Sequence, residues 1–502
     1  MGEPTVVDRL ASPAIAWQDL RNPMEPERPE QRYADELLQK AVAAAEAMLA
    51  FSQKEVDAIV EAVYRVAYAA RIDLAVMAYE ETGIGVLEHK VVKNAWASLL
   101  VYEDIRDLKT VGVVGHDPRA GITEIVQPKG PILALLPLTN PTSTAIFKIL
   151  ICLKSRNPVI FSPHRAARKS IKETVRLLEA AAVTAGAPPG AIQIATKPQK
   201  DHIEAVMRHR DLAMILATGT GSVVRWAQSS GTPTYGVGPG NVPVYVDRSA
   251  DLPLAARSIV HSKTFDNGTV CASEQAIVAL REIDGRLREL LEERGGYFCS
   301  QEDLAKLGQV AFDPVNRGMK ADVVGRSAAD IAERAGVSVP EGTRLLIVEP
   351  AGIGREYPLS HEILAPILAY YVVRSYDDAI STCIAVNEQG GIGHTVGLYA
   401  NDERVIEDFG RLMHAGRICV NQPTTQGAIG GLFNTLSPSL TLSCGSGGGN
   451  ITTDNISVSH LLNVHRVARR RVNSRWMQVP REIWQDPEVG PEEIRRLYNR
   501  NH

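Results

Sequence analysis

The sequence lacks the features that mark membrane, secreted and nucleic-acid-binding proteins. No apolar run approaches the ~20 residues that a membrane-spanning helix needs. The N-terminus has no basic segment followed by an apolar one, as a secretory signal requires, and Val6 stands where a myristoylation motif needs Ser or Thr. The 54 Lys and Arg nearly balance the 58 Asp and Glu, giving a net charge of −4. This balance gives no support to a nucleic-acid or anionic-membrane partner.

Cysteine is scarce, and the six cysteines are scattered. None shows the CxxC spacing of a zinc site or the density of a disulfide scaffold. No HExxH or Walker A motif and no cluster of metal ligands occurs, so we expect no metal. These absences together predict a soluble, cytoplasmic protein. The cysteines are Cys152, Cys271, Cys299, Cys383, Cys419 and Cys444.

The 502 residues are enough for about three domains or lobes at roughly 150 residues each. Residues 1–34 carry Pro and Glu with little pattern, and we expect an extension there. From Asp35 the apolar spacing predicts two helices, followed by a third over 86–105. Ser52 and Glu55 have the spacing of a capping box at the start of the second helix.

Between residues 131 and 230 apolar strand-like runs alternate with helical segments. This pattern predicts an α/β fold with a doubly wound parallel sheet, covered by helices on both faces. Such sheets bind ligands at the carboxyl ends of their strands. The segments that fall there are Leu138–Asn140, Ser162–His164 and Thr218–Gly221.

Other segments have a weaker pattern. DPRAG, at 117–121, joins two alternating stretches and predicts a hairpin, which is a candidate oligomer contact. A second strand–helix region runs from about 241 to 435, and the glycine-rich stretch 443–450 marks a break after it. We expect RVARRR, at 466–471, to form a basic helix whose charged face is solvated.

Cys271 is the cysteine that best suits a nucleophile. A reactive thiol needs access and help to ionise. The glycine-containing turn FDNGTV before Cys271, with Asn267, Thr269 and Ser273 nearby, suits an exposed thiol. The opposing interpretation is a buried filler cysteine, because free cysteine is among the most buried residue types.

Two further features allow a functional and a structural interpretation. Asn140 follows a strand and precedes Pro141, where its amide would donate to an oxyanion or, as the spacing alone slightly favours, cap the helix. The Gly219–Thr220–Gly221 segment would cradle a diphosphate, but it lacks the full GxGxxG pattern, and a tight turn is equally consistent.

Several longer segments, in consistent order from about residue 35 to 484, resemble the CoA-acylating branch of the aldehyde dehydrogenase superfamily. That branch includes acetaldehyde and propionaldehyde dehydrogenases and the aldehyde half of bifunctional alcohol/aldehyde enzymes. The matching segments are YEETGIGVLEHKVVKN (79–94), PLTNPTST (137–144), FSPHRAARKS (161–170), ATGTGSVVRWAQSSGTPTYGVGPGN (217–241), FDNGTVCASEQ (265–275), SHEILAPILA (360–369), GGIGHTVGLY (390–399) and LTLSCGSGGGN (440–450) followed by HLLNVHRVARRR.

The resemblance implies a role for individual residues. Cys271 matches the nucleophile, and Asn140 matches the oxyanion-hole asparagine. Glu362 matches the carboxylate that holds the nicotinamide ribose, while His394 and Thr395 fall in the substrate and CoA pocket. For His394 a purely structural role stays equally open. The other implied cofactor-binding residues are Ser162, Pro163, His164, Thr218, Gly219, Gly221, Gly238 and Leu364.

The resemblance also implies an aldehyde dehydrogenase-like arrangement of domains. It consists of a dinucleotide-binding domain, an α/β catalytic domain and a β-hairpin element for a homodimer or homotetramer. The corresponding ranges are 1–34 for an N-terminal extension, 35–110 and 127–241 for the cofactor-binding domain, 242–437 for the catalytic domain, 111–126 and 438–484 for oligomerisation, and 485–502 for a C-terminal extension.

One departure from the superfamily separates the candidate activities. Hydrolytic members carry a Glu-Leu-Gly-Gly segment whose glutamate activates water. Residues 236–240 here read Gly-Val-Gly-Pro-Gly and hold no carboxylate. The expected reaction is therefore transfer of an acyl group from a Cys271 thioester to CoA, with hydride transfer to NAD or NADP. A hydrolytic, CoA-independent enzyme is an alternative, and a non-catalytic oligomeric protein is disfavoured by the intact candidate residues.

The substrate, the cofactor and the partners stay open. A short aliphatic aldehyde is expected, and sulfoacetaldehyde is an alternative if Arg417 or Asn421 faces the pocket. Arg165 and Arg168 would favour NADP if they met a 2′-phosphate. Segments 1–34 and 485–502 are candidates for docking to a partner or to the shell of a bacterial microcompartment. In the second segment Ile494, Leu497 and Tyr498 share one helical face, although an ordinary C-terminal cap explains them as well.

Overall fold

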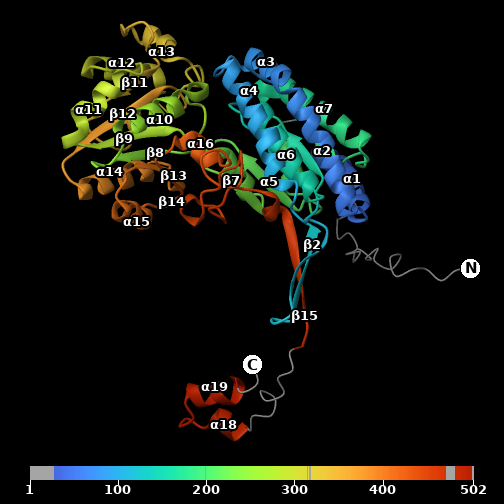
Figure 1. Ribbon diagram of the computed structural model, residues 1–502. Coiled ribbons are helices and arrows are strands. Elements are labelled where there is room, and N and C mark those ends of the chain that lie inside the picture. The colour runs from blue at the N-terminus through green and yellow to red at the C-terminus, as the bar shows by residue number, and fades with distance from the viewer. Residues whose placement is uncertain (1–27, 198, 314, 316–317, 471–480, 500–502) are drawn as a thin grey trace, which may run out of the picture.

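The computed structural model describes residues 28–197, 199–313, 315, 318–470 and 481–499. Three sheets organise the chain (Figure 1). A five-stranded parallel sheet lies in the first half, a seven-stranded parallel sheet lies in the second, and a three-stranded antiparallel sheet extends away from both.

The first layer is helical. Helix α1 begins at Pro29, six residues before the predicted start, because a proline suits the first turn of a helix. The capping box of Ser52 and Glu55 is confirmed at the start of α2. The sequence analysis missed α3, and the predicted third helix is a continuous segment interrupted by one π-helical turn. The elements are α1 (Pro29–Leu49), α2 (Gln53–Ala69), α3 (Arg71–Thr82), α4 (Leu87–Ala95), η2 (Trp96–Leu100) and α5 (Val101–Ile105).

The five-stranded sheet has the order β5-β4-β3-β6-β7, and all four pairings are parallel. The predicted doubly wound sheet is therefore confirmed, with the direction of winding reversing between β3 and β6. Its strands are β3 (Ile132–Leu135), β4 (Val159–Ser162), β5 (Ile192–Ile194), β6 (Met214–Thr218) and β7 (Thr234–Val237). Its helices are α6 (Pro141–Lys154), η3 (Arg165–Ala167), α7 (Arg168–Thr184), α8 (Lys200–Met207) and α9 (Gly221–Gln228).

Alternate residues of β3 face two different cores. Ile132 and Ala134 pack in the core that includes α6, α7 and α2, while Leu133 and Leu135 pack in the core that includes α1 and α8. Both faces are apolar because helices cover both sides of the sheet. Helix α6 is buried along its whole length, which explains its continuous apolar sequence.

The second sheet is also parallel throughout, in the order β10-β11-β12-β9-β8-β13-β14. Its strands are β8 (Val242–Val246), β9 (Glu274–Leu280), β10 (Gly296–Phe298), β11 (Leu345–Val348), β12 (Ile367–Val373), β13 (Gly393–Tyr399) and β14 (Ala415–Val420). The helices of this region are α10 (Leu252–Thr264), η4 (Phe265–Gly268), α11 (Arg281–Glu292), α12 (Gln301–Ala311), α13 (Ala328–Ala335), η5 (Pro358–Ser360), α14 (Tyr376–Glu388), α15 (Glu403–Leu412) and α16 (Thr424–Ile429).

The third sheet confirms the predicted hairpin and corrects another prediction. Strands β1 (Gly112–Asp117) and β2 (Ile122–Pro128) form the hairpin around DPRAG. Strand β15 (Leu462–Ala468) pairs with β2, so the predicted basic helix over 466–471 is wrong for 466–468. The free edge of β2 supplies backbone partners for this segment. Arg469 and Arg470 follow the strand and are not helical either. Arg471 lies outside the described residues.

The C-terminal segment contains α18 (Arg481–Gln485) and α19 (Pro491–Asn499). The side chains of Leu497 and Tyr498 lie outside the described part of the chain, as do residues 1–27 of the predicted N-terminal extension. The glycine-rich stretch contains the short turn η6 (Ser446–Gly448), and η7 (Val458–Leu461) leads into β15. No helix within the described ranges is long and apolar enough to cross a bilayer.

Candidate active site

Cys271 lies between the turn η4 and strand β9. Asp266 and Asn267 in that turn have φ of 49° and 53°, so the chain bends sharply before it reaches Cys271. Five of the six cysteines are buried, and Cys271 alone is partly accessible. Burial, together with the charge of Glu362, raises the pKa of the Cys271 thiol to about 12. The turn therefore presents one accessible thiol that is protonated at neutral pH.

The glycine segment 236–240 packs directly against Cys271. A Cβ atom on Gly240 would lie 1.8 Å from the carbonyl oxygen of Cys271 and 3.3 Å from Cε1 of His394. Only glycine fits this approach without a shift of the backbone. Residues 236–240 therefore lie beside the thiol-bearing residue without offering a carboxylate.

Glu362 reaches the same place from another segment. Its Oε1 accepts a hydrogen bond of 2.9 Å from the backbone N–H of Gly240. Burial raises the pKa of Glu362 to about 7, against the opposing effects of that hydrogen bond and of Lys263. The carboxyl group therefore changes its charge near neutral pH, close enough to Cys271 to influence the thiol.

An apolar cluster surrounds Cys271. Trp96 stacks on Phe265, with ring centroids 5.0 Å apart, and both belong to this cluster. Such a lining suits a small aliphatic group better than a charged one. The cluster contains Val92, Trp96, Val237, Phe265, Val270, Cys271, Ala272, Cys419, Ala428, Ile429, Leu440, Leu442 and Cys444.

The side chain of Asn140 does not cap helix α6, which corrects the interpretation that spacing alone favoured. Its Oδ1 accepts a hydrogen bond of 2.6 Å from Nζ of Lys93, and its Nδ2 donates to Oγ1 of Thr139 at 3.0 Å. The amide is thus fixed by side chains and not by the first turn of α6.

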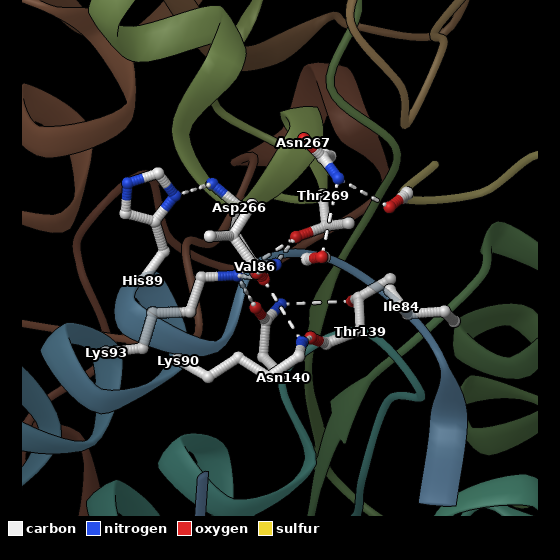
Figure 2. A network of polar contacts seen from close by, with 12 residues as sticks. Ile84, Val86, His89, Lys90, Lys93, Thr139, Asn140, Asp266, Asn267 and Thr269 are labelled. Carbon is white, nitrogen blue, oxygen red and sulfur yellow. Dashed lines mark hydrogen bonds and ion pairs between the residues drawn. The ribbon is translucent and has the colours of Figure 1, made fainter. Parts of the chain in front are cut away.

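Lys93 belongs to a buried polar network that the sequence analysis missed (Figure 2). The Asp266 carboxylate receives hydrogen bonds from Lys90, Lys93 and Thr269 through Oδ2, and from the N–H of Val86 through Oδ1. Asp266 has no exposed surface. The sequence feature that could have revealed this network is the pair Lys90 and Lys93. These lysines are three residues apart, on one face of the helix predicted over 86–105.

Six of the residues predicted to bind the cofactor lie at one edge of the five-stranded sheet: Ser162, Pro163, His164, Thr218, Gly219 and Gly221. Leu135 of β3 is paired with Ser162 of β4 and with Ala217 of β6, so these three strands end together. The segments 136–140, 162–164 and 218–221 therefore leave the sheet side by side. Pro163 is buried and His164 is exposed at this edge.

The loops at this edge include a helix start and a contact with a distant segment. Helix α9 begins at Gly221 with no side-chain cap, which leaves the N–H groups of its first turn available to a diphosphate. Thr218 is held by Thr441, with 3.0 Å between the hydroxyl oxygens. Leu364 lies two residues after Glu362 and accepts a backbone hydrogen bond from Gly325.

His394 and Thr395 begin strand β13 and are fully buried. Nδ1 of His394 lies 3.0 Å from Oγ1 of Thr395, while its Nε2 has no partner in the described structure. Burial and the charge of Arg417 hold the pKa of His394 well below its usual value. The imidazole is therefore neutral, with one nitrogen uncommitted near Gly240.

The two residues that would recognise an anionic substrate are engaged elsewhere. All five N–H donors of Arg417 are used, by Thr395, His394, Ser443, Thr453 and Asn455. The side chain of Asn421 bonds to both backbone groups of Ala400. Neither residue has a group free for a sulfonate, so the condition for the sulfoacetaldehyde alternative is not met.

Comparison with known proteins agrees with this arrangement. The model of the aldehyde dehydrogenase family matches residues 24–433. The aldehyde-alcohol dehydrogenase of Clostridium acetobutylicum is 42% identical over 454 residues, which cover 90% of this chain and 52% of that protein. The chain therefore spans about half the length of this relative.

Two solved structures are similar over nearly their whole length. An acetylating aldehyde dehydrogenase from Geobacillus thermoglucosidasius shares 43% identity, with a TM-score of 0.86 over 88% of this chain and 97% of that one. A propionaldehyde dehydrogenase from Rhodopseudomonas palustris, solved with bound propionyl-CoA, shares 28% identity, with a TM-score of 0.79 over 87% and 94%. On the strength of the family match and of these relatives, the chain belongs to the aldehyde dehydrogenase family.

Proposed function

We propose that the chain is a CoA-acylating aldehyde dehydrogenase that oxidises a short aliphatic aldehyde to its acyl-CoA. The observation that carries the proposal is the contact between Cys271 and Gly240. It places a carboxylate-free glycine segment beside the thiol, where hydrolytic relatives carry their water-activating glutamate. The apolar lining around Cys271 supports an uncharged aldehyde, and the names of the similar proteins support acyl transfer to CoA.

The Cys271 thiol is protonated at neutral pH, so the reaction begins when it gives up its proton to water and the thiolate attacks the aldehyde carbon. A C–S bond forms, and the carbonyl oxygen becomes an oxyanion that the Asn140 amide and the Cys271 N–H stabilise. When bound at the sheet edge, NAD or NADP accepts the hydride from that carbon. Loss of the hydride leaves a thioester on Cys271.

The second half of the reaction releases the acyl group. The thiolate of CoA attacks the thioester carbon, the bond to Cys271 breaks, and the acyl-CoA leaves with the thiolate of Cys271 restored. We place the CoA thiol on the side of the site where His394 and Thr395 lie. Glu362 holds the ribose hydroxyls of the cofactor when it is ionised.

The test is the rate of nicotinamide reduction with propanal, with and without CoA, in the wild type and in Cys271→Ala. We expect steady turnover only when both CoA and Cys271 are present. Steady turnover without CoA would overturn the proposal. It would mean that another group activates water to hydrolyse the thioester, and the carboxylate whose charge acts on Cys271 is Glu362. The Asn140→Ala variant is expected to lose about 10²–10³ in kcat.

We also propose that the three-stranded sheet joins copies of the chain into a homodimer or homotetramer. Val113 and Val467 share one face of this sheet by register and are 54% and 45% exposed. Exposed valines on a projecting sheet are explained by a second copy that covers them. We expect Val467→Asp to shift the mass measured by light scattering toward the monomer, and an unchanged mass would contradict this proposal.

For the C-terminal segment we propose docking to a partner, such as the shell of a microcompartment. The support is that α19 begins at Pro491, carries Glu492 and Glu493 in its first turn, and follows the last strand of the fold in the sequence. Deletion of 485–502 tests the proposal. Unchanged activity with lost co-localisation is expected, whereas unchanged co-localisation would leave α19 as an ordinary end of the chain.

A further inference from the structure

The ammonium group of Lys93 makes one hydrogen bond with each of its three protons. Its acceptors are Oδ2 of Asp266 at 2.5 Å, Oγ1 of Thr269 at 3.0 Å and Oδ1 of Asn140 at 2.6 Å. Lys93 is only 2% exposed, so no water competes for these protons. A lysine carries three N–H donors and no acceptor, so this set of partners uses the charged form completely.

This arrangement fixes the orientation of the Asn140 amide. With Oδ1 on the Lys93 ammonium, the NH₂ group must point the other way. One of its protons goes to Oγ1 of Thr139, and the second has no hydrogen-bond partner within the described residues. A reversed amide would set its NH₂ against the ammonium, donor against donor. The free N–H is therefore held on the side away from Lys93.

The same cation also fixes the turn that leads into Cys271. Asp266 and Thr269 precede Cys271 by five and two residues, and both accept a hydrogen bond from Lys93. Asn140 directly precedes helix α6, in the half of the chain that holds the five-stranded sheet. One ammonium on α4 thus bonds both to the Asn140 side chain and to Asp266 and Thr269 in the turn before Cys271 (Figure 2). It links the two donors of the proposed oxyanion hole, the Asn140 amide and the Cys271 backbone N–H.

We propose that Lys93 is a positioning residue, which holds the Asn140 amide with its free N–H toward the oxygen that becomes negative during attack by Cys271. This inference rests on the proposed function, because the role of Asn140 belongs to it. Lys93 itself touches neither the substrate nor the reacting atoms. Its effect on the rate passes through Asn140.

Lys90 provides a matched control. It is 3% exposed and lies 3.2 Å from the same Oδ2 of Asp266. Its other contact is the backbone oxygen of Thr139, at 3.4 Å, and it makes no hydrogen bond to the Asn140 side chain. Lys90→Met and Lys93→Met therefore each remove one buried cation from the same carboxylate, but only the second releases the amide.

The protonation state of Lys93 provides a second test of the proposal. Burial lowers the pKa of Lys93 to about 8, although Asp266 and Cys271 favour its charge; Lys90 opposes it. His89, whose Nδ1 accepts a hydrogen bond of 2.8 Å from the backbone N–H of Asp266, is a further titratable group here, and burial lowers its pKa too. A neutral amine has two protons for three acceptors, so the hold on Asn140 weakens as the pH rises past about 8.

The experiment measures acylation of Cys271 by p-nitrophenyl acetate, as the burst of p-nitrophenolate. This reaction passes through an oxyanion on Cys271 but needs no aldehyde, nicotinamide or CoA. The variants are Lys93→Met, Lys90→Met, Asn140→Ala and the double variant Lys93→Met/Asn140→Ala. Each is compared with the wild type, with the melting temperature as a check on folding.

We expect Asn140→Ala to slow acylation by about 10²–10³ and Lys93→Met to slow it by at least about ten-fold. Lys90→Met is expected to lower the melting temperature comparably but to slow acylation less than three-fold. The double variant is expected to match Asn140→Ala alone, since residues that act as a unit are not additive. Multiplied losses in the double variant, or equal losses for the two lysines, would overturn the proposal.

The pH dependence tests the proposal even if Lys93→Met does not fold. We expect the ratio of the wild-type rate to the Asn140→Ala rate to fall by about ten-fold between pH 7 and pH 9, because the cation is then lost. A constant ratio would overturn the role of Lys93. Because the ester assay is independent of the aldehyde reaction, failure of CoA-dependent turnover would be recognised separately as failure of the proposed function.

Discussion

The backbone of Gly240 lies so close to Cys271 that a Cβ atom there would stand 1.8 Å from the Cys271 carbonyl oxygen. Gly240→Ala must therefore displace the turn that carries the thiol. A shift of about 1 Å at a reacting group costs on the order of 10² in rate, and we expect a loss of that size in kcat/KM for the aldehyde. Gly285→Ala is the control, because nothing lies within 4 Å of its Cβ position. Equal activities of the two variants would contradict the close contact.

The pKa of Glu362 predicts how cofactor binding depends on pH. Burial raises its pKa to about 7, so the group is neutral below that pH and ionised above it. Only the ionised carboxylate accepts hydrogen bonds from both ribose hydroxyls, and we expect KM for the nicotinamide cofactor to decrease as the pH rises past about 7.

Glu362→Gln is the control for this effect, because the amide keeps the shape and cannot ionise. Its KM should stay high and flat across the same range. If the wild type and Glu362→Gln have the same pH profile, another group controls cofactor binding.

His394 should act in the second half of the reaction. Its Nε2 has no partner among the described residues and lies on the side of Gly240. We expect His394→Asn to leave the single turnover of nicotinamide reduction without CoA within about three-fold of the wild type. Steady turnover with CoA should fall by about 10² or more, as the loss of a general acid or base does. Equal losses of rate in the single turnover without CoA and in the steady turnover with CoA would identify His394 as a structural residue.

Arg165 offers a test of cofactor choice. It follows the predicted ribose-binding segment and is exposed, and its side chain makes no hydrogen bond or ion pair within the described ranges. Arg168 instead donates to the backbone oxygen of Thr196. We expect Arg165→Ala to raise KM for NADP about ten-fold or more, with KM for NAD unchanged, as loss of a charge-assisted hydrogen bond predicts. Arg168→Ala should change neither, and an identical effect on both cofactors would exclude contact with a 2′-phosphate.

The parts of the fold that local patterns encode were predictable. The parallel sheet follows from apolar runs separated by helices, and the capping box follows from the spacing of Ser52 and Glu55. The hairpin follows from DPRAG. Each of these signals spans only a few residues, so one sequence is enough to detect it.

The features that were missed depend on contacts between distant segments. Arg466–Ala468 form a strand because β2 offers an open edge more than 300 residues earlier in the chain. Lys93 and Asp266 are separated by 173 positions, and only the fold brings them together. The role of Asn140 depended on the same contact, since its amide bonds to Lys93 and not to the helix that it precedes.

The pairing of β15 with β2 has a consequence for synthesis of the protein. Strand β2 is complete at Pro128, but its partner Leu462–Ala468 leaves the ribosome only after most of the second sheet. At about 5–20 residues per second, the nascent chain carries an open strand edge for tens of seconds. An open edge pairs readily with other chains. Neighbouring ribosomes on one message therefore carry copies of the same hairpin with this edge open at the same time, which exposes it to pairing between nascent chains.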